Sequence, residues 1–270
     1  MSKTQTKEMI NIGVIGAGGR MGRMLIEAVQ DNPQTSLSAA IEREGSSLIG
    51  TDAGEVAAIE RLNIKIVDDL VSVIDDIDVL IDFSLPDATE QNMQTCAEHK
   101  VAMVIGTTGF NEQQEQVLTE ASKHIPIVYA GNYSTGVNLS LKLLGMAAKA
   151  FGNEADVEVI EAHHKHKIDA PSGTAYMMAQ AVAEARGQNL KEVAVYGREG
   201  QTGAREAGSI GIHAIRGGEI IGDHTVMFIA DGEVVEITHR ARARMTFAAG
   251  AVRATTWVIQ QKAGQYNMQD

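Results

Sequence analysis

Three histidines and two lysines occupy five consecutive positions in the segment EAHHKHKIDAPSGTA, residues 161–175. Histidine exchanges protons near neutral pH and lysine carries a positive charge, so the segment contains groups suited to acid–base chemistry on an anion. It continues into Pro171, Ser172, Gly173 and Thr174. Serine caps helices, and the free N–H groups of a helix start bind anions. The pattern therefore predicts an anion-binding helix end beside a proton donor.

Two other interpretations of this segment compete. A metal site needs converging ligands, but neighbours such as His163 and His164 on an extended chain point to opposite faces, and Lys167 repels a cation. We therefore expect no metal. A solvated basic loop is the second alternative, but the apolar run VEVIEA delivers the histidines from a buried strand. We favour an active site that, beside a nicotinamide, would reduce a C=N or C=C bond of an acidic substrate.

The elements that position this segment begin with an alternation of short apolar runs and amphipathic runs. INIGVIG, LSAAIE, DVLIDFS, VAMVIG and IPIVYAGN are typical of strands, and helical patterns lie between several of them. This alternation predicts an α/β fold with a Rossmann-type, doubly wound parallel sheet. We expect the first domain to comprise residues 1–132 and 244–270, because the C-terminal run MTFAAGAVRATTWVIQQK is helical and would pack back on it.

After residue 132 the pattern changes. A helix over about 137–151 precedes the strand DVEVIEAHH, and another helix, GTAYMMAQAVAEAR, follows the histidines. IRGGEI and ADGEVVEI each place Gly-Gly or Asp-Gly between strand-like runs, which predicts two tight antiparallel hairpins. We expect residues 133–243 to form a second α+β domain with a mixed or antiparallel sheet, for substrate binding and oligomerisation.

The glycine-rich segment VIGAGGRMGRM lies between the first strand and the first helix. A dinucleotide fingerprint would need glycine at position 21, which is Met, but Gly16, Gly19 and Gly22 form a respaced version. Gly16 would allow the tight turn, while Gly18 and Gly19 would let N–H groups approach phosphate. The alternative is a glycine-rich turn without a ligand.

Glu42 ends the second strand, 20 residues beyond Gly22, where a carboxylate can bind an adenosine ribose. Alone it would favour NAD, but Arg43 beside it could engage the 2′-phosphate of NADP, so both cofactors stay open. GTTGF and AGNYS leave later strands at the edge where such sheets bind ligands.

Composition restricts the class of protein. The formal net charge of −12 argues against nucleic-acid and anionic-membrane partners. The single cysteine, Cys96, lies in a helical pattern and fits a reducing cytoplasm, where we expect it to be a packed, inert thiol. The N-terminal MSKTQTKEMI lacks the apolar core of a signal peptide, and no run reaches membrane-spanning length.

The segments GAGGRMG, GTTGF and above all EAHHKHKIDAPSGTA resemble the 4-hydroxy-tetrahydrodipicolinate reductase (dihydrodipicolinate reductase) family of lysine and diaminopimelate biosynthesis. The resemblance implies a homotetramer that uses NADH or NADPH to reduce a cyclic dicarboxylate. It implies that His163 and Lys167 are catalytic and that His164, Ser172, Gly173 and Thr174 bind substrate. The implied cofactor contacts are Gly16, Ala17, Gly18, Gly19, Arg20, Met21, Glu42, Arg43, Gly106, Thr107, Thr108, Ala130, Gly131, Asn132 and Tyr133.

Two alternatives stay open at this point. Another dehydrogenase of a dicarboxylate imine or amino acid, such as an aspartate dehydrogenase, would share the lysine and the helix end. A non-catalytic nucleotide sensor could share the fold. A sensor would not need a proton donor, so His163 and Lys167 favour an enzyme.

Overall fold

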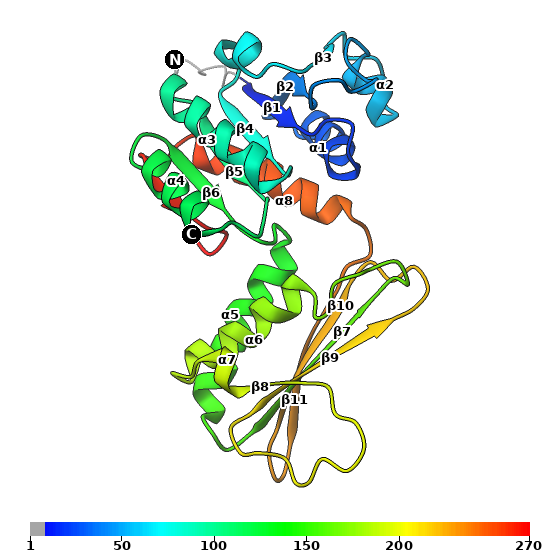
Figure 1. Ribbon diagram of the computed structural model, residues 1–270, viewed down its shortest axis with the longest axis vertical. Coiled ribbons are helices and arrows are strands. Elements are labelled where there is room, and N and C mark those ends of the chain that lie inside the picture. Colours follow the sequence, from blue (N-terminus) through cyan, green and yellow to red (C-terminus); the bar gives the residue numbers. More distant parts are fainter. Residues whose placement is uncertain (1–8) are drawn as a thin grey trace, which may run out of the picture. The chain divides into compact units, whose positions relative to one another are not determined.

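The computed structural model describes residues 9–270, which form two compact units (Figure 1). Unit 1 extends to Tyr133 and resumes at Met245–Met268 and Asp270, whereas unit 2 comprises Ser134–Arg244 and Gln269. The expectation that the N-terminus lacks a signal peptide concerns mainly residues 1–8 and lies outside the described residues. Within residues 9–270, no helix combines the length and apolar character needed to cross a membrane.

Unit 1 is built, within the described residues, on a seven-stranded sheet in the order β12-β6-β5-β4-β1-β2-β3, with every neighbouring pair parallel. The chain winds outward from β1 in one direction and then in the other, which confirms the expected Rossmann-type, doubly wound sheet. The strands are β1 (Ile10–Ile15), β2 (Thr35–Ile41), β3 (Ile66–Val67), β4 (Val79–Asp82), β5 (Ala102–Ile105), β6 (Pro126–Tyr129) and β12 (Gly264–Tyr266).

Helices cover both faces of this sheet and create an apolar core on each. The neighbours Val14 and Ile15 point into different cores, as alternation along a strand buried on both sides requires. Helix α8 packs against α1 within unit 1. Cys96 is buried and unbonded in the other core, as expected. The helices are α1 (Arg20–Asp31), α2 (Ala53–Ala57), the 3-10 helix η1 (Val71–Asp76), α3 (Pro86–His99), α4 (Glu112–Ser122) and α8 (Met245–Val258).

Unit 2 contains a mixed five-stranded sheet in the order β11-β10-β7-β9-β8, again within the described residues. Helices α5 and α6 pack together on one face over a core that includes Val157, Val159 and Phe228 (Figure 1). This sheet confirms the second part of the expected fold class. The elements are α5 (Thr135–Phe151), β7 (Asp156–His163), α6 (Gly173–Ala185), α7 (Leu190–Val193), β8 (Ala194–Tyr196), β9 (Ile210–Arg216), β10 (Asp223–Ile229) and β11 (Val234–Arg240).

One of the two predicted hairpins is wrong. ADGEVVEI does connect β10 and β11, which pair antiparallel from Asp223↔Arg240 to Ile229↔Val234. IRGGEI connects β9 to β10, but these strands lie on opposite sides of β7: β9 pairs with it parallel and β10 antiparallel. The Gly-Gly pair therefore belongs to a connection that passes the end of β7. Local turn residues predicted the reversal, and pairing with a distant strand decided the partner.

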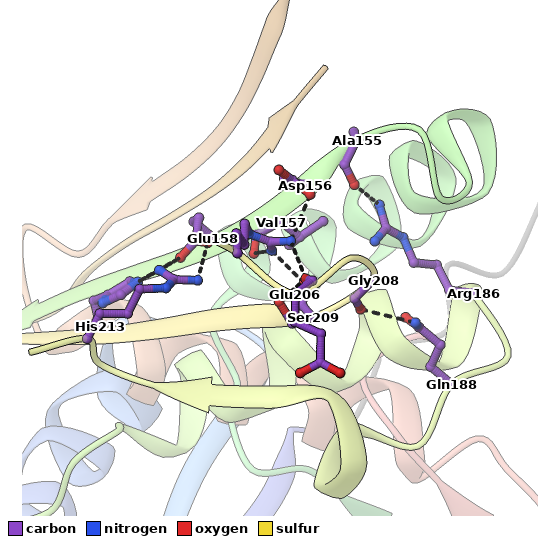
Figure 2. Close-up of polar contacts among 12 residues, drawn as sticks. Ala155, Asp156, Val157, Glu158, Arg186, Gln188, Glu206, Gly208, Ser209 and His213 are labelled. Atoms are coloured by element: carbon purple, nitrogen blue, oxygen red, sulfur yellow. Dashed lines mark hydrogen bonds and ion pairs between the residues drawn. The ribbon is translucent and has the colours of Figure 1, made fainter. Parts of the chain in front are cut away.

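The glycine-rich segment 197–209, between β8 and β9, is held against β7 by two carboxylates, those of Glu158 and Asp156 (Figure 2). The oxygens of Glu158 accept from Arg198 at 2.8 and 3.0 Å and from Nε of Arg205 at 3.0 Å, and one lies 2.7 Å from Nε2 of His213. Arg205 also donates to the Asp156 carboxylate at 2.7 Å. We call Glu158, Arg198, Arg205 and His213 the Glu158 cluster.

Candidate active site

The turn after β1 has the geometry that the respaced glycines predict. Gly16 adopts φ +69°, in the left-handed region that favours glycine. A Cβ at Gly22 would lie 2.0 Å from the carbonyl oxygen of Gly16, so the first turn of α1 packs directly on the loop. The glycine at position 22 therefore serves the close helix–turn approach that a glycine at position 21 would serve in the usual fingerprint.

The N–H groups in this turn are not all directed outward. The Gly18 N–H donates to Oε2 of Glu42 at 2.9 Å, and the Gly19 N–H donates to the Gly16 carbonyl at 2.9 Å. The expectation that these two N–H groups face a phosphate therefore differs from the structure, in which both are used inside the loop. What faces outward is the start of α1, where no side chain caps the helix and no acidic residue lies in the first turn, whereas Arg20 is exposed. A helix end of this kind suits a pyrophosphate.

Glu42 and Arg43 follow β2, next to the glycine turn. The Glu42 carboxylate accepts the Gly18 N–H and, through Oε1, the Arg43 N–H at 3.1 Å. The carboxylate is half-buried and the Arg43 side chain is exposed. Glu42 thus shapes the turn in addition to presenting a negative charge at the ribose position expected from the sequence.

The ends of β4 and β5 are joined by a buried polar network that the sequence did not single out. Asp82, completely buried, accepts from Ser84 Oγ at 2.6 Å and from Asn92 Nδ2 at 2.8 Å. The Thr107 hydroxyl lies 2.9 Å from that of Thr89 and is buried with it. Of the residues expected to contact cofactor here, Gly106 is half-buried, Thr107 has a buried side chain, and Thr108 is exposed.

Tyr133 is a core residue. Its side chain is buried, and its hydroxyl lies 2.8 Å from the Ile105 carbonyl oxygen and 2.9 Å from that of Val128. A Cβ at Gly250 would be 1.9 Å from the Tyr133 carbonyl oxygen, so α8 also covers its backbone. The loop residues before it, Ala130, Gly131 and Asn132, are half-buried or exposed at the carboxyl edge of the sheet.

In unit 2, the carboxyl-terminal end of strand β7 carries His163 and its partner Glu161. Both point to the face covered by α5 and α6 and are buried, and His163 Nδ1 lies 2.6 Å from Oε2 of Glu161. Arg216, at the end of β9, donates to both oxygens of Glu161 at 2.7 and 2.8 Å. The Ser172 N–H donates to Oε1 of Glu161 at 3.0 Å. Glu161 therefore connects the histidine to the start of α6.

Burial raises the pKa of Glu161, but the hydrogen bonds from Arg216 and His163 outweigh it and the net shift is downward. Burial lowers the pKa of His163, and the opposing attraction of Glu161 does not reverse this because Lys167 and Arg216 add positive charge nearby. His224, edge-on to His163 at 5.1 Å between ring centroids, has a pKa lowered to about 4 by burial and by His163. A carboxylate and a neutral imidazole are the resting forms at neutral pH.

The start of α6 is capped by a buried serine. The Ser172 hydroxyl caps the helix by accepting the Ala175 N–H at 3.2 Å and lies 3.0 Å from Nε2 of His224. With its side chain buried, Ser172 is placed to form the helix end. Gly173 is exposed and Thr174 half-buried at the first two helical positions.

Lys167 and His164 lie on the connection between β7 and α6. Lys167 Nζ contacts both oxygens of Asp169 at 2.8 Å, and its N–H donates to the His164 carbonyl at 3.1 Å. Nδ1 of His164 is buried and has no hydrogen-bond partner among the described residues. The Asp169 carboxylate therefore orients the Lys167 ammonium group. A ligand carboxylate could bind the same ammonium group. Within residues 9–270, no group of three His, Cys, Asp or Glu side chains could hold a metal ion.

Sequence comparisons agree over the whole chain. The profile described as "Dihydrodipicolinate reductase, N-terminus" matches residues 10–133, and the one described as "Dihydrodipicolinate reductase, C-terminus" matches residues 136–270. The 4-hydroxy-tetrahydrodipicolinate reductase of Psychrobacter arcticus is 85% identical over 270 residues, covering 100% of this chain and 97% of the relative. The protein of the same name from Acinetobacter baumannii is 59% identical over 259 residues, covering 96% and 94%.

Solved structures agree with the sequence profiles. A dipicolinate-bound dihydrodipicolinate reductase from Paenisporosarcina sp. TG-14 has a TM-score of 0.75 at 27% identity, covering 96% of this chain and 97% of its own. An amine dehydrogenase from Mycobacterium smegmatis, at TM-score 0.61 and 13% identity over 95% and 94%, shares the fold. The doubly wound sheet, its glycine turn and the histidine–lysine segment define a Rossmann-type oxidoreductase. The chain belongs to the dihydrodipicolinate reductase family.

Proposed function

We propose that this protein reduces 4-hydroxy-tetrahydrodipicolinate to tetrahydrodipicolinate, with NADH or NADPH as the reductant and release of water. The observation that carries the proposal is the 85% identity to a 4-hydroxy-tetrahydrodipicolinate reductase along the entire chain. The profile matches to both halves support it, as does the buried pair of Glu161 and His163 at the end of β7. The reaction belongs to lysine and diaminopimelate biosynthesis.

The residues of unit 2 suit a cyclic dicarboxylate. The N–H groups at Gly173 and Thr174 and the positive charge of Lys167 favour the two carboxylates, and His164 offers a further ring nitrogen. A reduced nicotinamide, when bound, would supply a hydride to one atom of the unsaturated bond. His163 takes up a proton from solvent at Nε2 and gives it to the other atom, and Lys167 assists as the second catalytic group.

The residues of unit 1 suit a dinucleotide. The uncapped start of α1 and Arg20 favour the pyrophosphate, while Glu42 and Arg43 lie at the position of the adenosine ribose. Glu42 favours the free hydroxyls of NADH and Arg43 favours the 2′-phosphate of NADPH, so we propose that both serve. Further contacts would come from the backbone of Gly106–Thr108 and 130–133.

We further propose a cytoplasmic homotetramer. Ile160, Ile215 and Met227 lie on the face of the unit 2 sheet opposite α5 and α6, where they are half-buried or exposed. Such a row of apolar side chains on a sheet face is suited to packing against a second copy of the same sheet. Sedimentation velocity would test this, because a monomer at micromolar concentration would contradict the proposal.

The reaction is tested by following NADH and NADPH oxidation at 340 nm, with substrate generated by a synthase from pyruvate and aspartate semialdehyde. We would compare the wild type with His163→Gln and with the matched control His166→Gln, which changes an exposed histidine of the same segment. We expect rapid oxidation by the wild type and the control, and a large loss in His163→Gln.

Two other outcomes would refute the proposal. Nucleotide binding without turnover on this substrate, but with turnover on an imine of a dicarboxylic amino acid, would indicate an aspartate dehydrogenase-type activity. Nucleotide binding without turnover on either would indicate a sensor.

A further inference from the structure

Elementary chemistry fixes the protonation state of the His163 nitrogen that faces Glu161. An ionised carboxylate only accepts hydrogen bonds, so the 2.6 Å contact requires that Nδ1 of His163 carry the proton. Nε2 is then the nitrogen that can gain and lose a proton. A Cβ at Gly222 would lie 3.0 Å from Nε2, so the glycine leaves space beside this atom.

Arg216 balances the charge of Glu161. The guanidinium contacts both carboxylate oxygens, and it is itself held by the carbonyl oxygens of Ile215 and Asp169, each at 2.7 Å. Arg216 pairs with His163 in the register between β7 and β9, so the two side chains belong to neighbouring strands at the same level. A bidentate arginine–carboxylate pair has a fixed plane, which fixes the carboxylate oxygen that the imidazole meets.

The charge around His163 comes from every element that packs on it. Glu161 of β7 is negative, Arg216 of β9 and Lys167 of the following loop are positive, and His224 of β10 is a neutral neighbour. An unbalanced carboxylate at hydrogen-bond distance would strongly favour the imidazolium. Burial is the largest cause of the lowered pKa of His163, and the positive charges of Lys167 and Arg216 act in the same direction.

We propose that Glu161 and Arg216 are positioning residues for His163. Glu161 selects the tautomer in which Nε2 exchanges the proton, and Arg216 cancels the carboxylate charge so that His163 can give up its proton near neutral pH. The inference rests on the proposed reductase function and deepens it. The same carboxylate also holds the Ser172 N–H, so the proton donor and the start of α6 share one anchor.

The test uses the full-length protein with isotope-labelled histidine, the His163 signals being assigned with His163→Gln. The variants are Glu161→Gln, Arg216→Met, Arg216→Lys and the double variant Glu161→Gln/Arg216→Met. The double variant removes both charges of the ion pair, so it can be used if a single variant folds poorly. Glu158→Gln is the matched control, because it removes a carboxylate bound by arginine and histidine on the opposite face of β7. Nucleotide affinity reports folding of each variant.

We expect the wild-type nitrogen shifts to show protonated Nδ1, and Glu161→Gln to lose this preference with a fall in kcat of about 100-fold. Arg216→Met should move the His163 titration and the pH–rate profile upward by about one pH unit or more, and Arg216→Lys should restore much of the difference. Glu158→Gln should leave the profile midpoint in place.

The proposal is overturned if wild-type His163 carries its proton on Nε2, or if Glu161→Gln retains the wild-type tautomer and pH profile. A fall in kcat with unchanged tautomer and titration would likewise refute it, since a merely structural role gives that result. Absence of wild-type turnover would refute the proposed function, while the nuclear magnetic resonance measurement would still decide the tautomer.

Discussion

Removal of the Glu158 charge should loosen the segment 197–209. Burial raises the pKa of Glu158, but hydrogen bonds from Arg198, His213 and Arg205 outweigh it and lower the pKa from 4.5 to about 2. A difference of this size corresponds to about 3 kcal/mol of preference for the charged form in the folded state. Since the Arg198 side chain is 32% exposed, solvent screening reduces this preference. We therefore take the contribution of the Glu158 charge to the stability of the segment as about 2 kcal/mol.

A loss of about 2 kcal/mol corresponds to about a 30-fold larger opening constant. We therefore expect Glu158→Gln to speed amide hydrogen exchange in residues 198–209 by about 30-fold at pH 7. Glu199→Gln is the matched control, because Glu199 is exposed in the same segment and makes no ion pair within the described part of the chain. Hydrogen exchange read by mass spectrometry resolves both variants.

The pH dependence supplies an independent check. Because the folded pKa of Glu158 is depressed, its contribution is complete above the unfolded value of 4.5 and is lost as the pH falls toward about 2. Wild-type protection factors in 198–209 should fall across this window, and those of Glu158→Gln should not. The reasoning would be refuted if residues 198–209 of Glu158→Gln had the protection factors of the wild type at pH 7. It would also be refuted if the protection factors of both proteins fell in parallel as the pH is lowered.

Three further predictions concern the nucleotide and substrate sites. Gly22→Ala places a Cβ 2.0 Å from a backbone oxygen, so NADH affinity measured by fluorescence should fall at least about tenfold, whereas Gly145→Ala, with open space, should not change it. Equal affinities would contradict the close approach of α1 to the turn. Glu42→Gln keeps an acceptor for the loop N–H but removes the charge, so the NADPH-to-NADH affinity ratio should rise at least about threefold. An unchanged ratio would show that Arg43 alone sets the preference. Lys167→Ala should reduce kcat by about 100-fold or more with nucleotide affinity unchanged. The control is Lys165→Ala, which changes an exposed lysine of the same segment. Equal steady-state kinetics of the two variants would show that Lys167 is not part of the site.

Tyr133 illustrates where sequence reasoning about the site reached its limit. Its position in AGNYS, after a strand of a Rossmann-type sheet, predicts a loop at the ligand edge. In the structure its side chain bridges the ends of β5 and β6 in the core, so a cofactor contact at this position would involve its backbone and the neighbouring loop residues. A sequence shows that an aromatic residue follows a strand. The direction in which its side chain points depends on which elements of the fold cover that residue.

The sequence by itself determined the alternation of strands and helices, the respaced glycine turn and the histidine–lysine segment before a helix start. These are local patterns, in which hydrophobic period, turn residues and caps act over a few positions. The tertiary structure alone decided the pairing of β9 and β10 with β7, and the contact of Glu161 with Arg216 across 55 positions. Glu161 did carry a sequence signal, a charged residue two positions before His163 at the alternate positions that Val157 and Val159 otherwise make apolar. Arg216 carried none. The partner of a buried charge is set by strand register, and strand register is decided when distant segments pack into one core.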